Sequence, residues 1–196
     1  MKFSKKLKIK DIVSMVDFSE KRVLDAGCGT GLYSKLAKEK GASEVIAVDF
    51  ASPAVKLTIQ NSKDIHGVIA SISNLPFRTG IFDVVMCISV LYHITDDILW
   101  ETAISELSRV LKPGGTLLVQ IEKREDFMFS ETYRGRPFKL YMEKFKENDL
   151  KFMNVENVFM PPKNKLLRLL LNTIPVLSKL LIRKRSENVL ICLKKI

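Results

Sequence analysis

A glycine-rich stretch near the start of the chain has the residue types of a nucleotide-binding loop. Asp25-Ala26-Gly27-Cys28-Gly29-Thr30-Gly31 follows the apolar pair Val23-Leu24. A strand that ends in glycines and leads into a helix turns tightly and brings backbone N–H groups close to a ligand. Asp49 ends the next apolar run, 18 residues after Gly31, where a carboxylate can accept hydrogen bonds from both hydroxyls of a ribose. These residues predict a site for a nucleoside-containing ligand.

The spacing of the glycines excludes two common classes of nucleotide site. The dinucleotide fingerprint needs a third glycine at the position of Leu32. The P-loop needs a Gly-Lys-Ser/Thr sequence, which this loop does not contain. The pattern is instead Asp-x-Gly-x-Gly-x-Gly, which suits a nucleoside ligand without a pyrophosphate.

Further motifs follow along the chain in a fixed order. They are Val45 to Asp49, Asn74-Leu75-Pro76-Phe77, Phe82-Asp83-Val84-Val85, Leu91-Tyr92-His93-Ile94 and Arg109 to Gly115. Together with Val23 to Gly31, they resemble the motifs of class I methyltransferases of the small-molecule type that depend on S-adenosylmethionine (SAM). The resemblance covers roughly residues 20–122 and implies that SAM is the cofactor and methyl donor.

The resemblance also implies a set of cofactor-binding residues. These are Asp25, Gly27, Cys28, Gly29, Asp49, Phe50, Ser71, Ile72 and Ile88. The glycines would pass beneath the methionine part of SAM, and Asp25 would face its amino group. Asp49 would bind the ribose, Phe50 would lie along the adenine, and Ile88 would offer backbone contacts. Ser71 departs from the family, which often has Asp there to accept from the adenine amino group, so we expect weaker adenine recognition.

Methyl transfer from a sulfonium is a direct displacement, so the protein must mainly align the reacting atoms. A general base is needed only for an acceptor that is protonated. His93 is the candidate catalytic base, and the alternative is a packing histidine. The candidates for the substrate rim are Tyr92, Arg124, Phe127 and Tyr133. We predict no metal site, because the 3 cysteines and 2 histidines form no ligand cluster.

Apolar runs and helical stretches alternate along the chain, which predicts a doubly wound α/β fold in one domain over 1–196. The first predicted strand ends at 24, and the others span 45–48, 67–70, 82–89, 116–121, 151–160 and 188–194. The predicted helices span 32–40, 95–111 and 137–148, and a further helix opens with Ser52 as its N-cap and Pro53 as its first helical residue. Unalternating apolar strands indicate burial on both faces, as in a parallel sheet. The resemblance implies a seven-stranded, Rossmann-like sheet whose last strand is antiparallel. A short helical segment is expected within 1–20.

The positive charge is concentrated in the last part of the chain. Residues 1–122 carry 15 Lys/Arg and 14 Asp/Glu, whereas residues 123–196 carry 17 and 8, so their net charges are +1 and +9. A basic, Leu-rich helical insert is predicted at 161–187, with seven basic and no acidic residues from Lys163 to Arg185. It would be a lid over the acceptor pocket, a contact with an anionic membrane surface, or an element that packs on the sheet or a second subunit.

These patterns favour a SAM-dependent methyltransferase whose partner is a small hydrophobic or anionic acceptor. One alternative is an RNA or protein methyltransferase that uses the basic C-terminal surface, although the Leu-rich spacing lacks the aromatic pattern of base stacking. Another is a SAM-binding partner or regulatory module without catalysis. Scattered cysteines and the lack of a signal peptide or spanning segment favour a cytoplasmic protein, with peripheral membrane contact left open. Both a monomer and a homodimer remain open.

Overall fold

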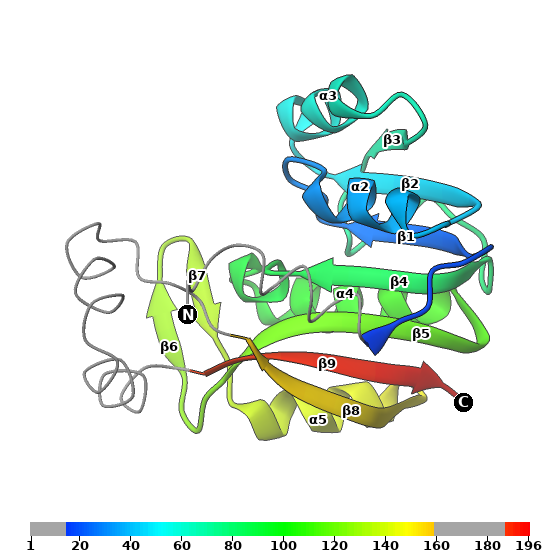
Figure 1. Ribbon diagram of the computed structural model, residues 1–196. Helices are drawn as coiled ribbons and strands as arrows, with labels where there is room; N and C mark the ends of the chain where they lie inside the picture. The colour runs from blue at the N-terminus through cyan, green and yellow to red at the C-terminus, as the bar shows by residue number, and fades with distance from the viewer. Residues whose placement is uncertain (1–14, 159–186) are drawn as a thin grey trace, which may run out of the picture.

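The computed structural model describes residues 15–158 and 187–196, which form a sheet flanked by helices and a separate short hairpin (Figure 1). The strands are β1 (Arg22–Ala26), β2 (Glu44–Asp49), β3 (His66–Ile69), β4 (Phe82–Ile88), β5 (Leu111–Lys123), β6 (Met128–Ser130), β7 (Tyr133–Gly135), β8 (Leu150–Val158) and β9 (Glu187–Lys195). The helices are α2 (Leu32–Glu39), α3 (Ser52–Asn61), α4 (Asp97–Arg109) and α5 (Phe138–Glu147), with a 3-10 turn η1 (Leu91–His93).

The seven-stranded sheet has the order β3-β2-β1-β4-β5-β9-β8. The five strands from β3 to β5 pair in parallel, and β9 pairs antiparallel with both β5 and β8. This confirms the predicted mostly parallel α/β fold with an antiparallel last strand. The strand order reverses between β1 and β4, and ligands in such sheets bind at the carboxyl ends of the strands beside that reversal.

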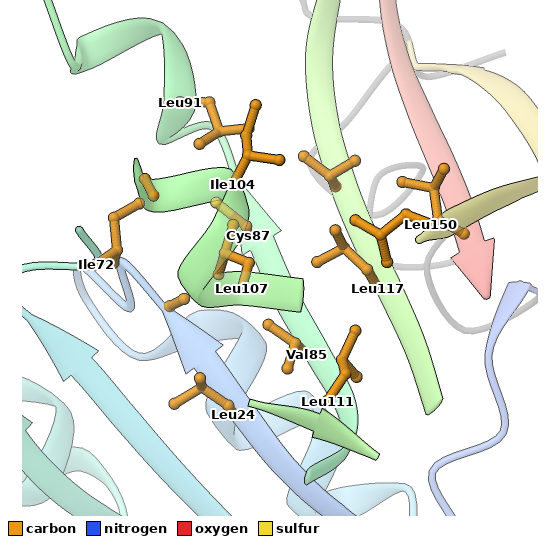
Figure 2. Close-up of a cluster of buried hydrophobic side chains, with 14 of the residues drawn as sticks. Leu24, Ile72, Val85, Cys87, Leu91, Ile104, Leu107, Leu111, Leu117 and Leu150 are labelled. Atoms are coloured by element: carbon orange, nitrogen blue, oxygen red, sulfur yellow. The ribbon is translucent and has the colours of Figure 1, made fainter. Parts of the chain in front are cut away.

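Two apolar cores hold the helices on the sheet. Leu24 of β1 belongs to a buried cluster that includes α4 and α5, whereas its neighbour Val23 belongs to a second cluster with Leu36 of α2. Figure 2 shows Leu107 of α4 close to Val85 of β4. Each such fully buried side chain contributes about 1.5–3 kcal/mol. Burial on both faces explains why the strands are apolar without alternation.

Two predicted helix starts are wrong. The helix expected over 95–111 spans 97–109, because the carboxylate of Asp96 accepts from the N–H of Leu99 at 2.8 Å and caps it. Ser52 was expected to cap α3, but it is the first helical residue. Ala51 precedes it in extended conformation without a side-chain cap.

The fifth strand is longer than the predicted 116–121, because it begins at Leu111 and runs through Pro113. The register with β4 moves from Phe82–Leu111 to Val84–Thr116, so the extra residues form a bulge. Gly114 has a φ of 72° there. Glycine and proline that were expected to separate a helix from a strand therefore bend the strand itself.

The hairpin of β6 and β7 was not predicted. It stands beyond the carboxyl ends of β4 and β5 (Figure 1). Ser130 pairs with Tyr133, so Glu131 and Thr132 form its turn. The hairpin packs on η1, which directly follows β4.

Most of the predicted insert at 161–187, and residues 1–14 of the N-terminal segment, lie outside the described residues. Val158 at the end of β8 and Glu187 at the start of β9 both lie at the carboxyl edge, because Glu187 pairs with Lys123. The single domain over 1–196 stays a prediction. Among the described helices, none is long and apolar enough to cross a membrane.

Candidate functional site

The glycine turn joins the carboxyl ends of β1 and β2. The N–H groups of Gly27 and Cys28 both donate to the carbonyl of Val48, at 2.8 and 2.9 Å. A Cβ on Gly27 would lie 2.4 Å from a methyl carbon of Val90, whereas a Cβ on Gly29 would meet nothing within 4 Å. Gly27 is thus required for packing, and open space lies beside Gly29.

Asp49 is held at the end of β2 by backbone amides on both sides. Its Oδ2 accepts from the N–H of Gly29 at 3.0 Å, and its Oδ1 accepts from the N–H of Ala51 at 2.9 Å. The side chain is 9% exposed. Each carboxylate oxygen keeps acceptor capacity, so the pair of oxygens is oriented to receive two neighbouring hydroxyl groups.

An apolar surface lies next to Asp49 at the ends of β2 and β3. Phe50 is 82% exposed, and Ile69, which pairs with Asp49 in the register, is 57% exposed. Ile72 is buried in the core behind this surface. Ser71 is exposed, and its Oγ accepts from the N–H of Ser73 at 3.2 Å. Large exposed apolar side chains beside a buried carboxylate suit a flat base attached to a ribose.

Asp25 lies beneath the turn and is 1% exposed. Ser34 of α2 donates to its Oδ2 at 2.5 Å. Burial raises the pKa of Asp25 to about 6, opposed by the bonds to Ser34 and assisted by the charge of Asp49. Asp25 therefore fixes α2 to the turn through a partner that the sequence did not indicate.

Two of the predicted cofactor residues turn their side chains inward. The Cys28 thiol is buried and accepts from the Thr58 hydroxyl at 3.6 Å, and burial raises its pKa to about 11. Ile88 is 5% exposed in the same core cluster. Only the backbone of these two residues is thus left to meet a ligand, which stays a prediction, and Cys28 is not an activated nucleophile.

The residues around Gly29 fit SAM. The open space at Gly29, the two oriented oxygens of Asp49 and the exposed ring of Phe50 follow one another along the carboxyl edge. They match in order the amino acid, ribose and base of an adenosyl cofactor. Their roles toward SAM stay predictions, now with a consistent geometry.

The ends of β4, β5 and β9 carry a second, polar group of side chains. Ser89, which follows β4, has a φ of 64°, and its hydroxyl donates to Gln120 at 3.2 Å. The Gln120 amide in turn donates to Asn188 at 3.1 Å. Backbone in the left-handed region is costly for a residue with a side chain and is often found at functional sites.

Three of the predicted rim residues meet around Glu122, which sequence reasoning missed. The Tyr133 hydroxyl donates to Glu122, Arg124 lies 3.4 Å from the same carboxylate oxygen, and the rings of Tyr92 and Tyr133 are 5.4 Å apart. Burial and the Glu122 carboxylate raise the pKa of Tyr133. The position of Glu122, directly after the predicted fifth strand, was the available signal. The fourth predicted rim residue, Phe127, stacks on Phe129 instead.

His93 lies at the end of η1 and is exposed. Its Nδ1 is 3.0 Å from the carbonyl oxygen of Thr132, in the turn of the hairpin. Its ring lies 4.7 Å from that of Tyr92. The structure thus brings the candidate base next to the tyrosine pair, and its role as a base stays a prediction.

Comparisons with known proteins identify the kind of domain that carries these residues. Residues 24–119 match a family model described as a methyltransferase domain. The chain is 34% identical over 99 residues to a tRNA (carboxymethyluridine(34)-5-O)-methyltransferase of Arabidopsis thaliana, covering 50% of this chain and 23% of that protein. It is 32% identical over 132 residues to a ubiquinone biosynthesis O-methyltransferase of Xanthomonas oryzae, covering 65% of this chain and 54% of that protein.

The chain therefore spans about half or less of the length of these relatives. The fold matches a crystal structure from Listeria monocytogenes described as a SAM-dependent methyltransferase, with a TM-score of 0.70 and 18% identity over 97% of each chain. From the motifs, the fold and the matched domain together, the chain belongs to the class I SAM-dependent methyltransferases, a family of enzymes whose cofactor is S-adenosylmethionine.

Proposed function

We propose that this chain binds SAM at the carboxyl ends of β1 and β2 and transfers its methyl group to a small acceptor at the rim beyond β4 and β5. The observation that carries the proposal is the Asp49 carboxylate, fixed by the amides of Gly29 and Ala51 beside the exposed Phe50. A buried carboxylate with spare acceptor capacity is costly unless it binds donors, and ribose hydroxyls are donors of the right spacing.

Bound SAM supplies a methyl group that is already activated by its sulfonium. The chain contributes orientation: Asp49 would hold the ribose, and the Gly29 turn would let the methionine part lie against the backbone. Fixing the donor and the acceptor in line is worth roughly 7–11 kcal/mol of the barrier. His93 would take a proton from an acceptor that carries one, and it lies beside Tyr92 at the rim.

The described rim favours a hydrophobic acceptor over an anionic one. Tyr92 and Tyr133 form a tilted aromatic pair, which suits a flat or apolar body. Arg124 is the cation predicted for the rim, but Glu122 and Asp126 each lie 3.4 Å from its guanidinium and balance its charge. A free anion would therefore have to displace a carboxylate to reach Arg124.

An RNA acceptor is the second candidate function. It is supported by the similarity to a protein named as a tRNA methyltransferase and by the net charge of +9 in residues 123–196. A rate of methyl transfer to purified tRNA that falls steeply as the salt concentration rises would favour an RNA acceptor. Methyl transfer to quinol precursors would favour a small-molecule acceptor. SAM binding without turnover on either class would favour the non-catalytic module.

Calorimetry with SAM and with S-adenosylhomocysteine (SAH) tests the cofactor site. We expect micromolar binding by the wild type and at least tenfold weaker binding by Asp49→Ala, because the oriented oxygens are lost. Asp64→Ala, at an exposed position in the turn before β3, is the matched control and should bind like the wild type. No binding by the wild type, or equal binding by Asp49→Ala, would overturn the proposal.

Two further predictions concern where the protein acts. A cytoplasmic location is expected from the sequence, with peripheral contact to anionic membranes as an open addition. Sedimentation with anionic vesicles tests the contact, and deletion of 163–185 should abolish it if the basic insert is responsible.

A further inference from the structure

The hydrogen bond between His93 and Thr132 determines where the imidazole carries its proton. The Thr132 atom is a carbonyl oxygen, which only accepts, so Nδ1 of His93 must be the donor at their 3.0 Å distance. In the neutral ring the lone pair then lies on Nε2. Nε2 is therefore the nitrogen that can accept a proton while this bond persists.

This bond belongs to a set of contacts between the same two segments, three of which share one spacing in the sequence. His93 meets Thr132, the Thr95 carbonyl accepts from Arg134 at 3.0 Å, and Asp97 accepts from Arg136. Each pair is separated by 39 residues, so the contacts recur at every second residue in parallel register. We call these three contacts the 93–97/132–136 ladder. A slip of either segment would break all three contacts together.

The ladder is held most firmly at its Asp97–Arg136 end, where the arginine is buried. Arg136 is 1% exposed, and its Nε and Nη2 donate to Oδ1 of Asp97 at 3.1 and 2.9 Å. Its guanidinium also lies 4.5 Å from the centre of the Trp100 ring. Arg134 donates to the other oxygen of Asp97 and lies 4.9 Å from the ring centre of Phe129. Asp97, the first residue of α4, thus binds both Arg134 of β7 and Arg136, which directly follows β7.

We propose that the ladder sets the tautomer of His93, and that Asp97 is the positioning residue that holds the hairpin carbonyl against its Nδ1. The inference rests on the proposed function, because a lone pair on Nε2 matters only where an acceptor loses a proton. It goes further, since it assigns a role to Asp97, Arg134 and Arg136, which lie outside the cofactor site. It also gives a reason for the ion pairs that hold the hairpin of β6 and β7 against α4 beside the acceptor rim.

Nitrogen NMR of the intact chain tests the tautomer directly. The chain has 2 histidines, and His66→Gln assigns their ring signals. At a pH where both rings are neutral, we expect His93 to carry its proton on Nδ1. His66, which is exposed at the start of β3, should show the Nε2 proton that a free imidazole favours. A His93 ring protonated mainly on Nε2 would overturn the proposal.

Asp97→Ala tests the positioning role. We expect the Nδ1 proton signal of His93 to give way to a mixture of both tautomers, while Asp97→Asn, which keeps one acceptor oxygen, restores part of it. Glu101→Gln is the matched control, because Glu101 is a carboxylate of α4 that pairs with Lys144 and takes no part in the ladder. An unchanged His93 tautomer in Asp97→Ala would overturn the role of Asp97. If Asp97→Ala does not fold, Arg134→Gln makes the same test.

SAH calorimetry on the same variants separates this inference from the proposed function. Wild-type chain that fails to bind SAH, with His93 still protonated on Nδ1, would reject the function and leave the ladder intact. SAH binding by a chain with the other tautomer would reject the ladder alone. Asp97→Ala and Glu101→Gln should both bind SAH like the wild type, because neither residue lies in the cofactor site.

Discussion

The cofactor end of the site holds its ligand-facing atoms through the backbone, whereas the acceptor rim holds them through long side chains. At the cofactor end, Gly27 and Cys28 are bonded to Val48, and the Asp49 carboxylate is bonded to two amides. At the rim, Glu122, Tyr133 and Arg124 hold one another by side-chain contacts. The cofactor end therefore depends on the glycines of the turn and on backbone hydrogen bonds, whereas a single side-chain substitution removes a contact at the rim.

Substitutions at the two ends should therefore affect ligand binding and the free energy of unfolding differently. A substitution at the cofactor end changes either the geometry of the glycine turn or the Asp49 carboxylate. It should lower both ligand affinity and stability only where the turn is tightly packed, as at Gly27. A substitution in the 93–97/132–136 ladder beside the rim removes an ion pair between segments 39 residues apart, so it loosens the hairpin without touching the cofactor turn. The following variants separate these effects.

Arg136→Ala should have the largest effect. The substitution leaves a hole beside Trp100 and removes one of the two arginine partners of Asp97 from a position that is 1% exposed. We expect a loss of about 3–4 kcal/mol in the free energy of unfolding, measured by urea denaturation. SAH affinity should stay within twofold of the wild type. Lys139→Ala, at an exposed position of α5, is the control. A large loss of SAH affinity at unchanged stability would contradict the separation of the two ends.

Asp25→Asn should change how stability depends on pH. The folded chain raises the pKa of Asp25 from 3.8 to about 6 by burial, so it holds a proton between these values that the unfolded chain releases. The stabilisation by Asp25 is therefore complete below about pH 4 and is lost as the pH rises through about 6. From pH 4 to 7, the wild type should lose about 3 kcal/mol of unfolding free energy relative to Asp25→Asn.

Urea denaturation at several pH values measures this difference for Asp25. Asp64→Asn, at an exposed position, should follow the wild type across the same range. A constant difference between the wild type and Asp25→Asn would show that Asp25 stays ionised inside the fold.

Gly29→Ala and Gly27→Ala should separate binding from folding within one turn. A methyl on Gly29 enters open space, so we expect about 1 kcal/mol of lost stability from its φ of 54° and about tenfold weaker SAH binding. A methyl on Gly27 meets Val90 at 2.4 Å and should cost about 2 kcal/mol of stability. Calorimetry and urea denaturation measure both quantities. Equal binding by Gly29→Ala and the wild type would place the ligand elsewhere.

Ser71→Asp should have the smallest effect, and in the favourable direction. The carboxylate would keep the bond to the N–H of Ser73 and add a charged acceptor for the adenine amino group. We expect about threefold tighter SAH binding by calorimetry. Ser71→Asn has the same shape without the charge and is the control. If both variants bind alike, charge at this position does not contribute to adenine recognition.

Much of the fold could be predicted because its signals are local. The apolar strands, the glycine turn and Asp49 each occupy a few consecutive residues, and the alternation of strands and helices indicates a doubly wound sheet. The seven strands and the antiparallel last strand were implied by the family resemblance. The start of β5 at Leu111 could not be predicted, because Pro113 and Gly114 are residues that usually end a helix or strand. They form a bulge within the strand because β4 pairs with residues before and after them.

The acceptor rim was predicted only in part, for a physical reason. Tyr92, Arg124 and Tyr133 were chosen one by one as neighbours of strand ends, but nothing in the chain indicated that they meet around Glu122. The same holds for Ser34 beneath Asp25, since a serine in a helix carries no signal of its partner. Contacts between distant side chains are decided by the packing of their elements.

The sequence by itself determined the nucleoside-type site and the doubly wound architecture, because glycine spacing and apolar runs act on the backbone within a few residues. Its ordered motifs also carried the family resemblance that implied SAM. Only the tertiary structure decided that Asp49 is fixed by two amides and that Asp25 is buried. It also decided that a hairpin carbonyl lies against Nδ1 of His93. Hydrogen bonds and burial depend on which segments meet in space, and the chain brings those segments together only when the sheet and its helices have packed.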